Sequence, residues 1–306
     1  MGQNSIPAGT FPQTFSHSSI SCYRECPRKY WFSYEALGTG IAPATSSVAL
    51  QIGTLYHSGM ELLLKNGLQA AEEMVEQYEA KFDFGADPEV RASIAAHSKG
   101  LLIAHDRKLK TMPTDSWTLI EAEKQFSLEI EPGVFFVGKL DALIQWDGAI
   151  WLMEHKALTI VDDSLFSTLP SDGQILRYTY AQRSEGVAIV GVVYTVAKKC
   201  QLRLKKTETP IQLNERMIEW YRTEAEVQHE IVRFGKGDVQ RCWNGTLSTI
   251  KTMIADTDYV RHENACRSKF GMCPFYGICM KQEWTEADLV PAGFRPKTSR
   301  HEELED

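Results

Sequence analysis

The sequence lacks a long hydrophobic run: no stretch of eighteen or more consecutive apolar residues occurs in its 306 residues. A helix that spans a membrane needs about 20 such residues, so the sequence predicts no membrane-spanning helix. The first fifteen residues, MGQNSIPAGTFPQTF, also lack the basic segment and apolar core of a secretory signal. We therefore expect a cytoplasmic protein with no membrane partner.

Cysteine is scarce, and no basic excess or phosphate-binding loop is present. The chain has seven cysteines, an odd number without an export signal, which argues against a disulfide framework and leaves metal ligation or unreactive thiols. The 33 basic and 40 acidic residues give a net charge of −7, which by itself is no nucleic-acid signature. The absence of a GxxxxGK[ST] motif argues against a P-loop ATPase.

The patterning that is present predicts one α/β domain. We expect a flexible leader at 1–13, a domain at 14–285 with a cysteine-rich segment at 259–283, and an acidic tail at 286–306 whose end, HEELED, is solvated. Apolar periodicity and turn residues predict helices at 16–34, 51–65, 68–82, 87–110, 172–183, 211–234 and 246–256. They predict strands at 117–129, 134–146, 149–157, 187–196 and 200–206. The expected fold class is a mixed sheet core surrounded by helices.

One predicted hairpin carries charges that a buried strand does not need. Residues 138–157, GKLDALIQWDGAIWLMEHKA, are two apolar strands around an Asp-Gly turn, yet they contain Asp141, Glu154 and Lys156. A carboxylate buried without compensation costs several kcal/mol, and a divalent cation compensates it. The alternative is an exposed edge strand on which Lys156 pairs with the two acids.

Strand alternation places Glu154 and Lys156 on one face and the His155 side chain on the other. Asp141 is expected near Glu154 across the hairpin. Two carboxylates, a backbone carbonyl and waters suit Mg²⁺ or Mn²⁺. A neighbouring lysine could position and deprotonate a water that attacks phosphorus, so the pattern favours metal-assisted phosphodiester hydrolysis.

Two helical pairs accompany the hairpin. Gln174 and Tyr178 share a helix face at i, i+4, and so do His57 and Glu61. Taken alone, each pair is more typical of a solvated helix face or a core histidine. Their order along the chain together with Asp141, Glu154 and Lys156 favours a common site.

Six stretches between Ser16 and Cys279 carry a family resemblance: SSISCYRECPRKYWFSY, GTLYHSGMELL, GKLDALI, EHKA, QILRYTYA and ACRSKFGMCPFYGIC. With them the chain resembles the PD-(D/E)XK nuclease superfamily, and within it the RecB-like exonuclease branch, which includes the nuclease domains of RecB and AddB and the CRISPR-associated RecB-like exonucleases. The resemblance implies a restriction-endonuclease-like fold. It implies metal ligation by His57, Asp141, Glu154 and the His155 carbonyl, catalysis by Lys156, and positioning of the substrate strand and lysine by Gln174 and Tyr178. The branch often has Asp, Thr or Asn near the position of His155.

Four cysteines form a candidate second site. Cys266, Cys273 and Cys279 follow one another closely, and Cys26 is the natural fourth ligand for zinc or an iron–sulfur cluster. The resemblance implies a [4Fe–4S] cluster that joins the N- and C-terminal segments, although C-x2-C is the commoner spacing in the branch. Zinc or buried thiols are the alternatives. Cys22 could replace Cys26, whereas Cys200 and Cys242 are expected to be inert.

Two segments could contact DNA. Basic residues that could bind phosphates occur in AKKCQLRLKK, at Lys198, Lys199, Arg203, Lys205 and Lys206. Tyr30 and Trp31 in YRECPRKYW could stack on unpaired bases. The sequence thus predicts a Mg²⁺- or Mn²⁺-dependent exonuclease acting on single-stranded DNA or DNA ends in recombination or repair, with a helicase or recombination partner. The alternative is a non-catalytic iron–sulfur DNA-binding scaffold.

Overall fold

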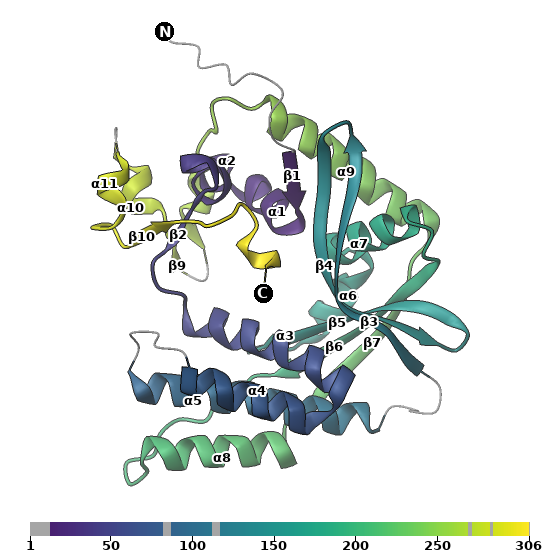
Figure 1. The fold of residues 1–306 in the computed structure, drawn as a ribbon, viewed down its shortest axis with the longest axis vertical. Coiled ribbons are helices and arrows are strands. Elements are labelled where there is room, and N and C mark those ends of the chain that lie inside the picture. The colour runs from purple at the N-terminus through teal and green to yellow at the C-terminus, as the bar shows by residue number, and fades with distance from the viewer. Residues whose placement is uncertain (1–12, 82–86, 112–116, 269–270, 282–283, 306) are drawn as a thin grey trace.

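A mixed six-stranded sheet forms the centre of the computed structural model (Figure 1). The structure describes residues 13–81, 87–111, 117–268, 271–281 and 284–305, so most of the expected leader lies outside it. The strand order is β1-β4-β5-β6-β7, with β3 paired to the other edge of β4. The strands are β1 (Gln13–Ser16), β3 (Trp117–Glu131), β4 (Val134–Trp146), β5 (Ala149–Leu158), β6 (Ile189–Lys198) and β7 (Val227–Arg233).

Strand β4 organises the sheet, because one of its edges is shared by two partners. β1 runs parallel to it over 134–137, and β5 runs antiparallel to it over 142–146. Residues 138–141 therefore lie at a fork between β1 and β5. The hairpin turn at Asp147 and Gly148 has positive φ angles of 49° and 70°, as the Asp-Gly sequence predicts, and the predicted β4–β5 hairpin is confirmed.

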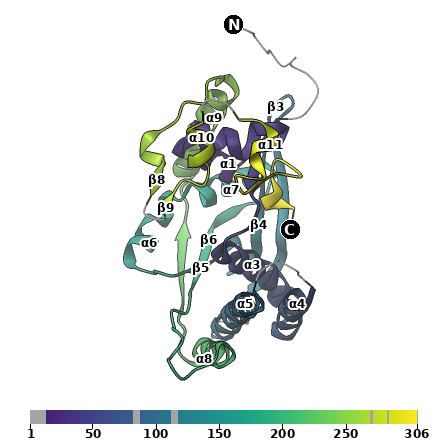
Figure 2. The same ribbon diagram turned by 90° about the vertical axis from the view of Figure 1, so that its left-hand side faces the viewer.

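Helices cover both faces of the sheet, in two groups that lie apart in Figure 2. Beyond the register shift at Ile150 and Trp151, odd-numbered residues of β5 and β6, such as Trp151 and Val193, belong to one core with the first group of helices. Even-numbered residues, such as Leu152 and Val192, belong to a second core with the other group. The first group is α3 (Val48–Asn66), α4 (Leu68–Lys81), α5 (Pro88–Leu109) and α8 (Pro210–Thr223); the second includes α1 (His17–Glu25), α7 (Gly173–Ser184) and α9 (Lys236–Ala255).

The N-terminal and C-terminal parts of the chain share a third, smaller core. Phe32 stacks on Phe275, which in turn stacks on Phe294, with ring centroids 5.4 Å apart in both pairs. The elements here are α2 (Pro27–Tyr30), η1 (Trp31–Glu35), η2 (Ala36–Gly38), β2 (Ile41–Pro43), η5 (Glu263–Ala265), β8 (Arg267–Ser268), β9 (Gly271–Met272), α10 (Tyr276–Cys279), α11 (Glu286–Leu289), β10 (Phe294–Pro296) and η6 (Glu302–Leu304). Strand β10 pairs antiparallel with β2, which fastens the two segments together. Among the described residues, no helix has the length and apolar character to cross a membrane.

The region after β6 corrects two predictions. The predicted strand at 200–206 is wrong, because the chain leaves the sheet at Lys198 and β7 takes the edge position beside β6. The single helix predicted at 211–234 is also wrong: α8 ends at Thr223, and β7 follows without a proline or glycine to mark the change. Helix α9, predicted at 246–256, begins at Lys236.

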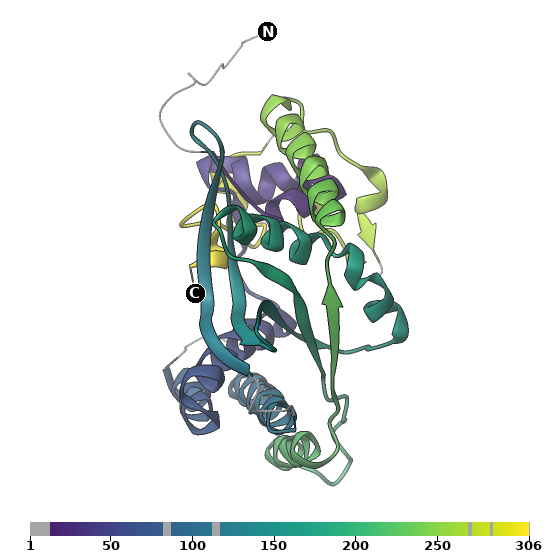
Figure 3. The ribbon, with the colours of Figure 1, turned by 90° about the vertical axis from the view of Figure 1, so that its right-hand side faces the viewer.

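The two ends of the chain also differ from expectation. The predicted helix at 16–34 is interrupted at Cys26, whose extended backbone is the conformation favoured before a proline. The end HEELED is not a solvated tail in the described part of the chain. Ser16 Oγ donates to Glu303 at 3.0 Å, and Arg295 pairs with Glu302 at 2.8 Å. A short helix, α6 (Asp163–Thr168), and a 3-10 turn, η4 (Leu169–Ser171), connect β5 to α7 (Figure 3).

Candidate active site

At the fork defined above, where β4 parts from β5, Asp141 lies against the backbone of β5. The ladder between these strands runs from the pair Trp146 and Ala149 to the pair Ala142 and Met153. One residue beyond, the Asp141 carboxylate accepts a hydrogen bond from the backbone N–H of His155 at 2.8 Å. The Asp141 side chain thus takes the place of the β4 backbone carbonyl that would accept this N–H if the ladder continued. β5 stays paired with β6 as far as Leu158, so the fork opens on the β4 side alone.

His57 reaches this fork from α3. Its Nδ1 lies 3.3 Å from Oδ1 of Asp141. Burial would lower the pKa of His57, but the Asp141 carboxylate outweighs that effect and raises it. Gly59 allows the approach of α3 to α5, since a Cβ at this position would lie 2.6 Å from a methyl group of Leu102. A glycine on the packed face of α3 thereby sets the depth at which His57 enters the site.

Glu123 of β3 is a third residue at the fork, and the sequence reasoning missed it. Ligand atoms of His57, Glu123 and Asp141 all lie within 4.8 Å of one another. In the β3–β4 register Ala122 faces Ala142, so the next residue, Glu123, lies opposite Asp141. Glu123 has a positive φ of 53°, and its carboxylate is 2.8 Å from Nζ of Lys139.

Burial raises the pKa of Glu123, and the nearby Lys139 only partly offsets that effect. Nothing in the sequence distinguishes Glu123 from Glu121 or Glu129 on the same strand. Its role depends on which residue of β3 lies opposite Asp141, and that register is a property of the folded sheet.

Glu154 and Lys156 project together on the second face of β5, as strand alternation predicts. Glu154 is buried at 5% exposure, and its carboxylate forms a salt bridge with the Lys156 ammonium. Burial, followed by repulsion from Asp141, raises the pKa of Glu154 to about 7. Burial would lower the pKa of Lys156, but Glu154 and Asp141 outweigh it and raise that pKa. The lysine therefore stays cationic between two carboxyl groups.

Helix α7 covers the site with Gln174 and Tyr178. The helix begins at the N-cap Asp172, whose carboxylate accepts the backbone N–H of Gln174 at 2.8 Å. Tyr178 is buried and packs edge-on against Phe126 at 5.2 Å. Burial and then the Glu154 charge raise the pKa of Tyr178, and a hydrogen bond with Gln174 opposes the rise. The tyrosine thus lies within electrostatic reach of the fork.

Gly138 makes room for this tyrosine. A Cβ at position 138 would lie 2.5 Å from the Phe126 ring and 2.9 Å from the Tyr178 ring. The glycine three residues before Asp141 is therefore required for α7 to pack over β4.

The His155 side chain points to the opposite face of the sheet, toward α5. Its Nδ1 is 2.7 Å from Thr195 Oγ1, and its ring meets the His105 ring edge-on at 5.0 Å. The backbone of His155 faces the fork, which is compatible with ligation of a metal ion by its carbonyl. The ligation itself stays a prediction.

The four cysteines named from the sequence line one cavity. Cys26 comes from the end of α1, and Cys266, Cys273 and Cys279 come from the C-terminal segment. The backbone N–H of Cys273 donates to the carbonyl of Cys266 at 2.9 Å, which closes their loop. Cys22 is not among the lining residues; its thiol lies 4.0 Å from the Ser33 hydroxyl, and burial raises its pKa to about 11.

The spacing of the four sulfurs bears on which group they fit. Four thiolates on one zinc ion, each at about 2.3 Å, lie roughly 3.8 Å apart. Among the described residues, no three cysteine sulfurs lie within 4.8 Å of one another. The sulfurs are thus not gathered in single-zinc geometry, and four thiols are a donor set that both zinc and iron–sulfur clusters use.

Of the two aromatic residues named as base-stacking candidates, Tyr30 is buried and Trp31 is partly buried. Tyr30 is 1% exposed and stacks on Tyr34 with centroids 5.4 Å apart. Trp31 packs edge-on against Phe32 and Trp284. The predicted stacking role of Tyr30 is wrong, because no base can reach a ring that is buried in the second core against Tyr23 and Tyr259.

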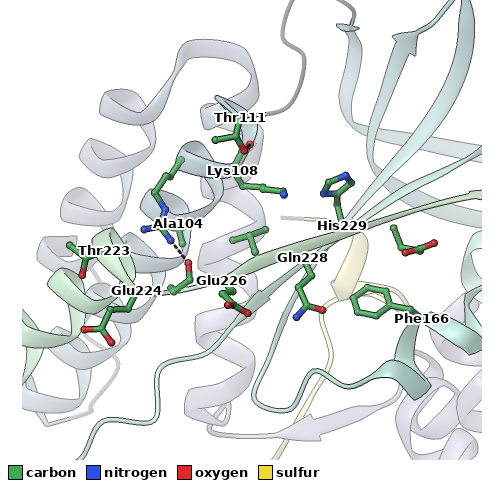
Figure 4. A pocket seen from close by; sticks show the side chains of 13 residues that line it. Ala104, Lys108, Thr111, Phe166, Thr223, Glu224, Glu226, Gln228 and His229 are labelled. Carbon is green, nitrogen blue, oxygen red and sulfur yellow. Dashed lines mark hydrogen bonds between the residues drawn. The ribbon is translucent and has the colours of Figure 1, made fainter.

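A large open groove of about 660 Å³ lies elsewhere, between the end of α5 and the edge strand β7 (Figure 4). Lys108, Glu226 and His229 line it, with Phe166 at one side. None of the fork residues line this groove. Its mixed charges include no described group of three metal-ligating side chains, so we place the candidate chemistry at the fork.

The comparisons with known proteins agree with this geometry. A model of the PD-(D/E)XK nuclease superfamily matches residues 14–280, a range that includes the fork and all four cysteines. No curated protein matches the chain. A crystal structure described as a "Putative exonuclease" from Eubacterium rectale superposes with a TM-score of 0.52 at 13% identity, covering 90% of this chain and 92% of that one, which supports the fold alone. The chain therefore belongs to the PD-(D/E)XK nuclease superfamily.

Proposed function

We propose that this nuclease is a Mg²⁺- or Mn²⁺-dependent DNA exonuclease of the RecB-like branch. The observation that carries the proposal is the convergence of His57, Asp141, Glu154 and Lys156 on the β4–β5 fork. Buried carboxylates gathered around a histidine are the arrangement expected where a divalent cation adds to the charge balance that Lys139 and Lys156 begin. Recombination and repair, with a helicase partner, are the processes in which we place it.

The residues at the fork fit such an ion. Nδ1 of His57 and carboxylate oxygens of Glu123 and Asp141 lie within 4.8 Å of one another and form a donor set suited to Mn²⁺ and, through the oxygens, to Mg²⁺. The Glu154 carboxylate is paired with Lys156 outside this group, and we propose that it turns to the ion when the ion binds. Bound there, the ion would activate a water and stabilise negative charge on the phosphoryl group. Lys156, which Glu154 and Asp141 keep cationic, would orient that water and stabilise the negative charge that develops on it as its proton passes to bulk water. Gln174 and Tyr178 would hold the substrate strand and the lysine.

The DNA path beyond the fork is proposed from exposed cations. Lys198 ends β6, and Arg203, Lys205 and Lys206 lie in the loop that leads from β6 to α8; all four side chains are exposed. This loop follows β6, the strand that pairs with β5 beside the catalytic residues. Cations there would bind the phosphates of a strand or strand end that enters the fork.

We also propose that Cys26, Cys266, Cys273 and Cys279 bind a structural [4Fe–4S] cluster. The support is that all four cysteines line one cavity and that no three of their sulfurs lie as close together as the ligands of a single zinc ion. Cluster ligation would close a loop of roughly 240 residues and so remove a large entropy from the unfolded chain. The cluster would fasten the C-terminal segment to α1 next to the third core.

The test is a cleavage assay on end-labelled single- and double-stranded DNA with Mg²⁺, Mn²⁺ or EDTA. We expect metal-dependent release of short products from ends and no cleavage of covalently closed circles. Asp141→Asn, Glu154→Gln and Lys156→Ala should each lower the rate roughly a hundredfold or more while DNA binding persists. Asp147→Asn, at the tip of the same hairpin, is the matched control and should cleave like the wild type. Binding without cleavage by the wild type would instead support a non-catalytic scaffold.

A further inference from the structure

A chain of buried polar side chains lies on the face of β5 opposite the fork. The Tyr56 hydroxyl is 2.8 Å from His105 Nδ1, and His105 Nε2 is 3.0 Å from Thr195 Oγ1. His155 Nδ1 lies 2.7 Å from the same Thr195 oxygen. All four side chains are at most 1% exposed, and no residue that we assigned to the chemistry uses them.

The proton positions follow from one choice, that the Thr195 hydroxyl donates to a backbone carbonyl. The Thr195 hydroxyl donates its single proton to the backbone carbonyl of Glu154 at 3.1 Å. Both imidazoles must then donate to the Thr195 oxygen. His105, which donates from Nε2, accepts the Tyr56 proton at Nδ1. His155 donates from Nδ1, and its Nε2 is buried with no hydrogen-bond partner. Burial lowers the pKa of both histidines, so both rings are neutral.

This arrangement lowers the stability of the folded state relative to an apolar core. A buried acceptor without a partner is unfavourable by about 1–3 kcal/mol, and apolar side chains of similar size would fill the same space without it. The apolar neighbours Met153 and Val193, on the same face of β5 and β6, show that this core accepts such residues. Folding alone therefore gives no reason for four polar groups here.

Every end of the network adjoins a residue of the fork. Tyr56 precedes His57 on α3. Thr195 holds the carbonyl of Glu154, and His155 lies between Glu154 and Lys156 while its backbone N–H holds Asp141. The network thus connects α3, α5, β5 and β6 directly behind the proposed metal ligands.

We infer that Tyr56, His105, Thr195 and His155 are positioning residues that fix the backbone of β5 and the start of the His57 turn relative to Asp141. The inference rests on the proposed metal-dependent function. Hydrogen bonds that orient metal ligands from behind contribute roughly 10- to 100-fold to metal affinity or activity. Thr195 is the centre of the network, because three of the network's four hydrogen bonds meet at Thr195 Oγ1.

The test measures Mn²⁺ binding by the loss of the free-ion electron paramagnetic resonance signal, on protein purified anaerobically with its cysteine site intact. Thr195→Val removes the oxygen with little change in shape, and we expect the Mn²⁺ dissociation constant to rise at least tenfold. The turnover rate should fall while the KM for DNA stays within twofold. Thr195→Ser keeps the hydroxyl and should restore both quantities. Tyr56→Phe, which removes one oxygen at the end of the network, should weaken Mn²⁺ binding less than Thr195→Val.

Val193→Ala is the matched control for stability. Val193 lies two residues from Thr195 on the same strand and face and is fully buried, so its truncation lowers stability without removing a hydrogen bond. We expect unchanged Mn²⁺ affinity in Val193→Ala. Equal weakening in both variants, or wild-type affinity in a folded Thr195→Val, would overturn the inference.

Asp141→Asn separates this inference from the proposed function. If the wild type binds Mn²⁺, Asp141→Asn loses the ion and Thr195→Val binds it normally, the positioning role alone fails. If the wild type binds no Mn²⁺ and cleaves no DNA, the proposed function fails and the inference fails with it.

Discussion

The backbone N–H of His155 donates to the Asp141 carboxylate at 2.8 Å, at the point where β4 and β5 stop pairing. This hydrogen bond ends the ladder and holds the two strands at the width of a side chain. It leaves the second oxygen of Asp141 facing His57. A local interruption of a hairpin thus creates the opening in which the charged residues meet.

The first prediction concerns Glu154 in metal-free protein. Its pKa is raised from 4.5 to about 7. A carboxyl group whose pKa is higher in the folded than in the unfolded chain stabilises the folded state. This contribution is complete below pH 4.5 and disappears as pH rises through about 7. As pH rises from 5 to 8.5 in EDTA, the free energy of unfolding of the wild type should therefore fall by about 1–3 kcal/mol relative to that of Glu154→Gln, because each pKa unit corresponds to ~1.4 kcal/mol.

Urea unfolding of both proteins at the two pH values measures this difference. Mg²⁺ should reverse it at pH 8.5, because the ion binds the deprotonated carboxylate. A difference between the two proteins that does not vary with pH would contradict the raised pKa.

The second prediction distinguishes a metal-ligating His57 from a core histidine. His57→Ala should raise the Mg²⁺ or Mn²⁺ concentration needed for half-maximal cleavage, in addition to any stability that it loses in EDTA with its partner Asp141. A histidine needed only for packing would instead show a stability loss of about 1–3 kcal/mol and an unchanged metal requirement. Metal titrations and melting curves of one variant decide between the two roles.

The third prediction concerns Glu123, which only the folded sheet places at the fork. Glu123→Gln should increase the Mn²⁺ concentration required for half-maximal activity roughly tenfold, as expected when one charged oxygen ligand is lost. Glu121→Gln, on the same strand with an exposed carboxylate, is the control. Equal metal requirements in both variants would remove Glu123 from the site.

The fourth prediction concerns the four-cysteine site. Anaerobically purified protein should be brown and absorb broadly near roughly 400 nm, as cysteine-ligated iron–sulfur clusters do. Cys26→Ala should lower iron content and solubility, whereas Cys242→Ala, outside the cavity, should change neither. A colourless protein with one equivalent of zinc and no iron would refute the cluster.

Local rules were enough to predict the hairpin and its charged face. Asp147 and Gly148 form the turn that their sequence favours, and a two-residue period puts Glu154 and Lys156 on one side of β5. The helices α3, α5 and α7 begin near their predicted positions because each N-cap lies next to the residues it caps. These features depend on contacts within a few residues of the chain.

Long-range pairing decided the rest. β7 is a strand because β6 offers it an edge, although its sequence continues from a helix without a break. Glu123 joins Asp141 through the register of β3 on β4, and Thr195 meets His105 through the packing of α5 on β6. A sequence pattern specifies which face a side chain occupies along its own element. Which partner it meets depends on contacts between residues far apart in the chain, and those form only when the sheet and its helices pack.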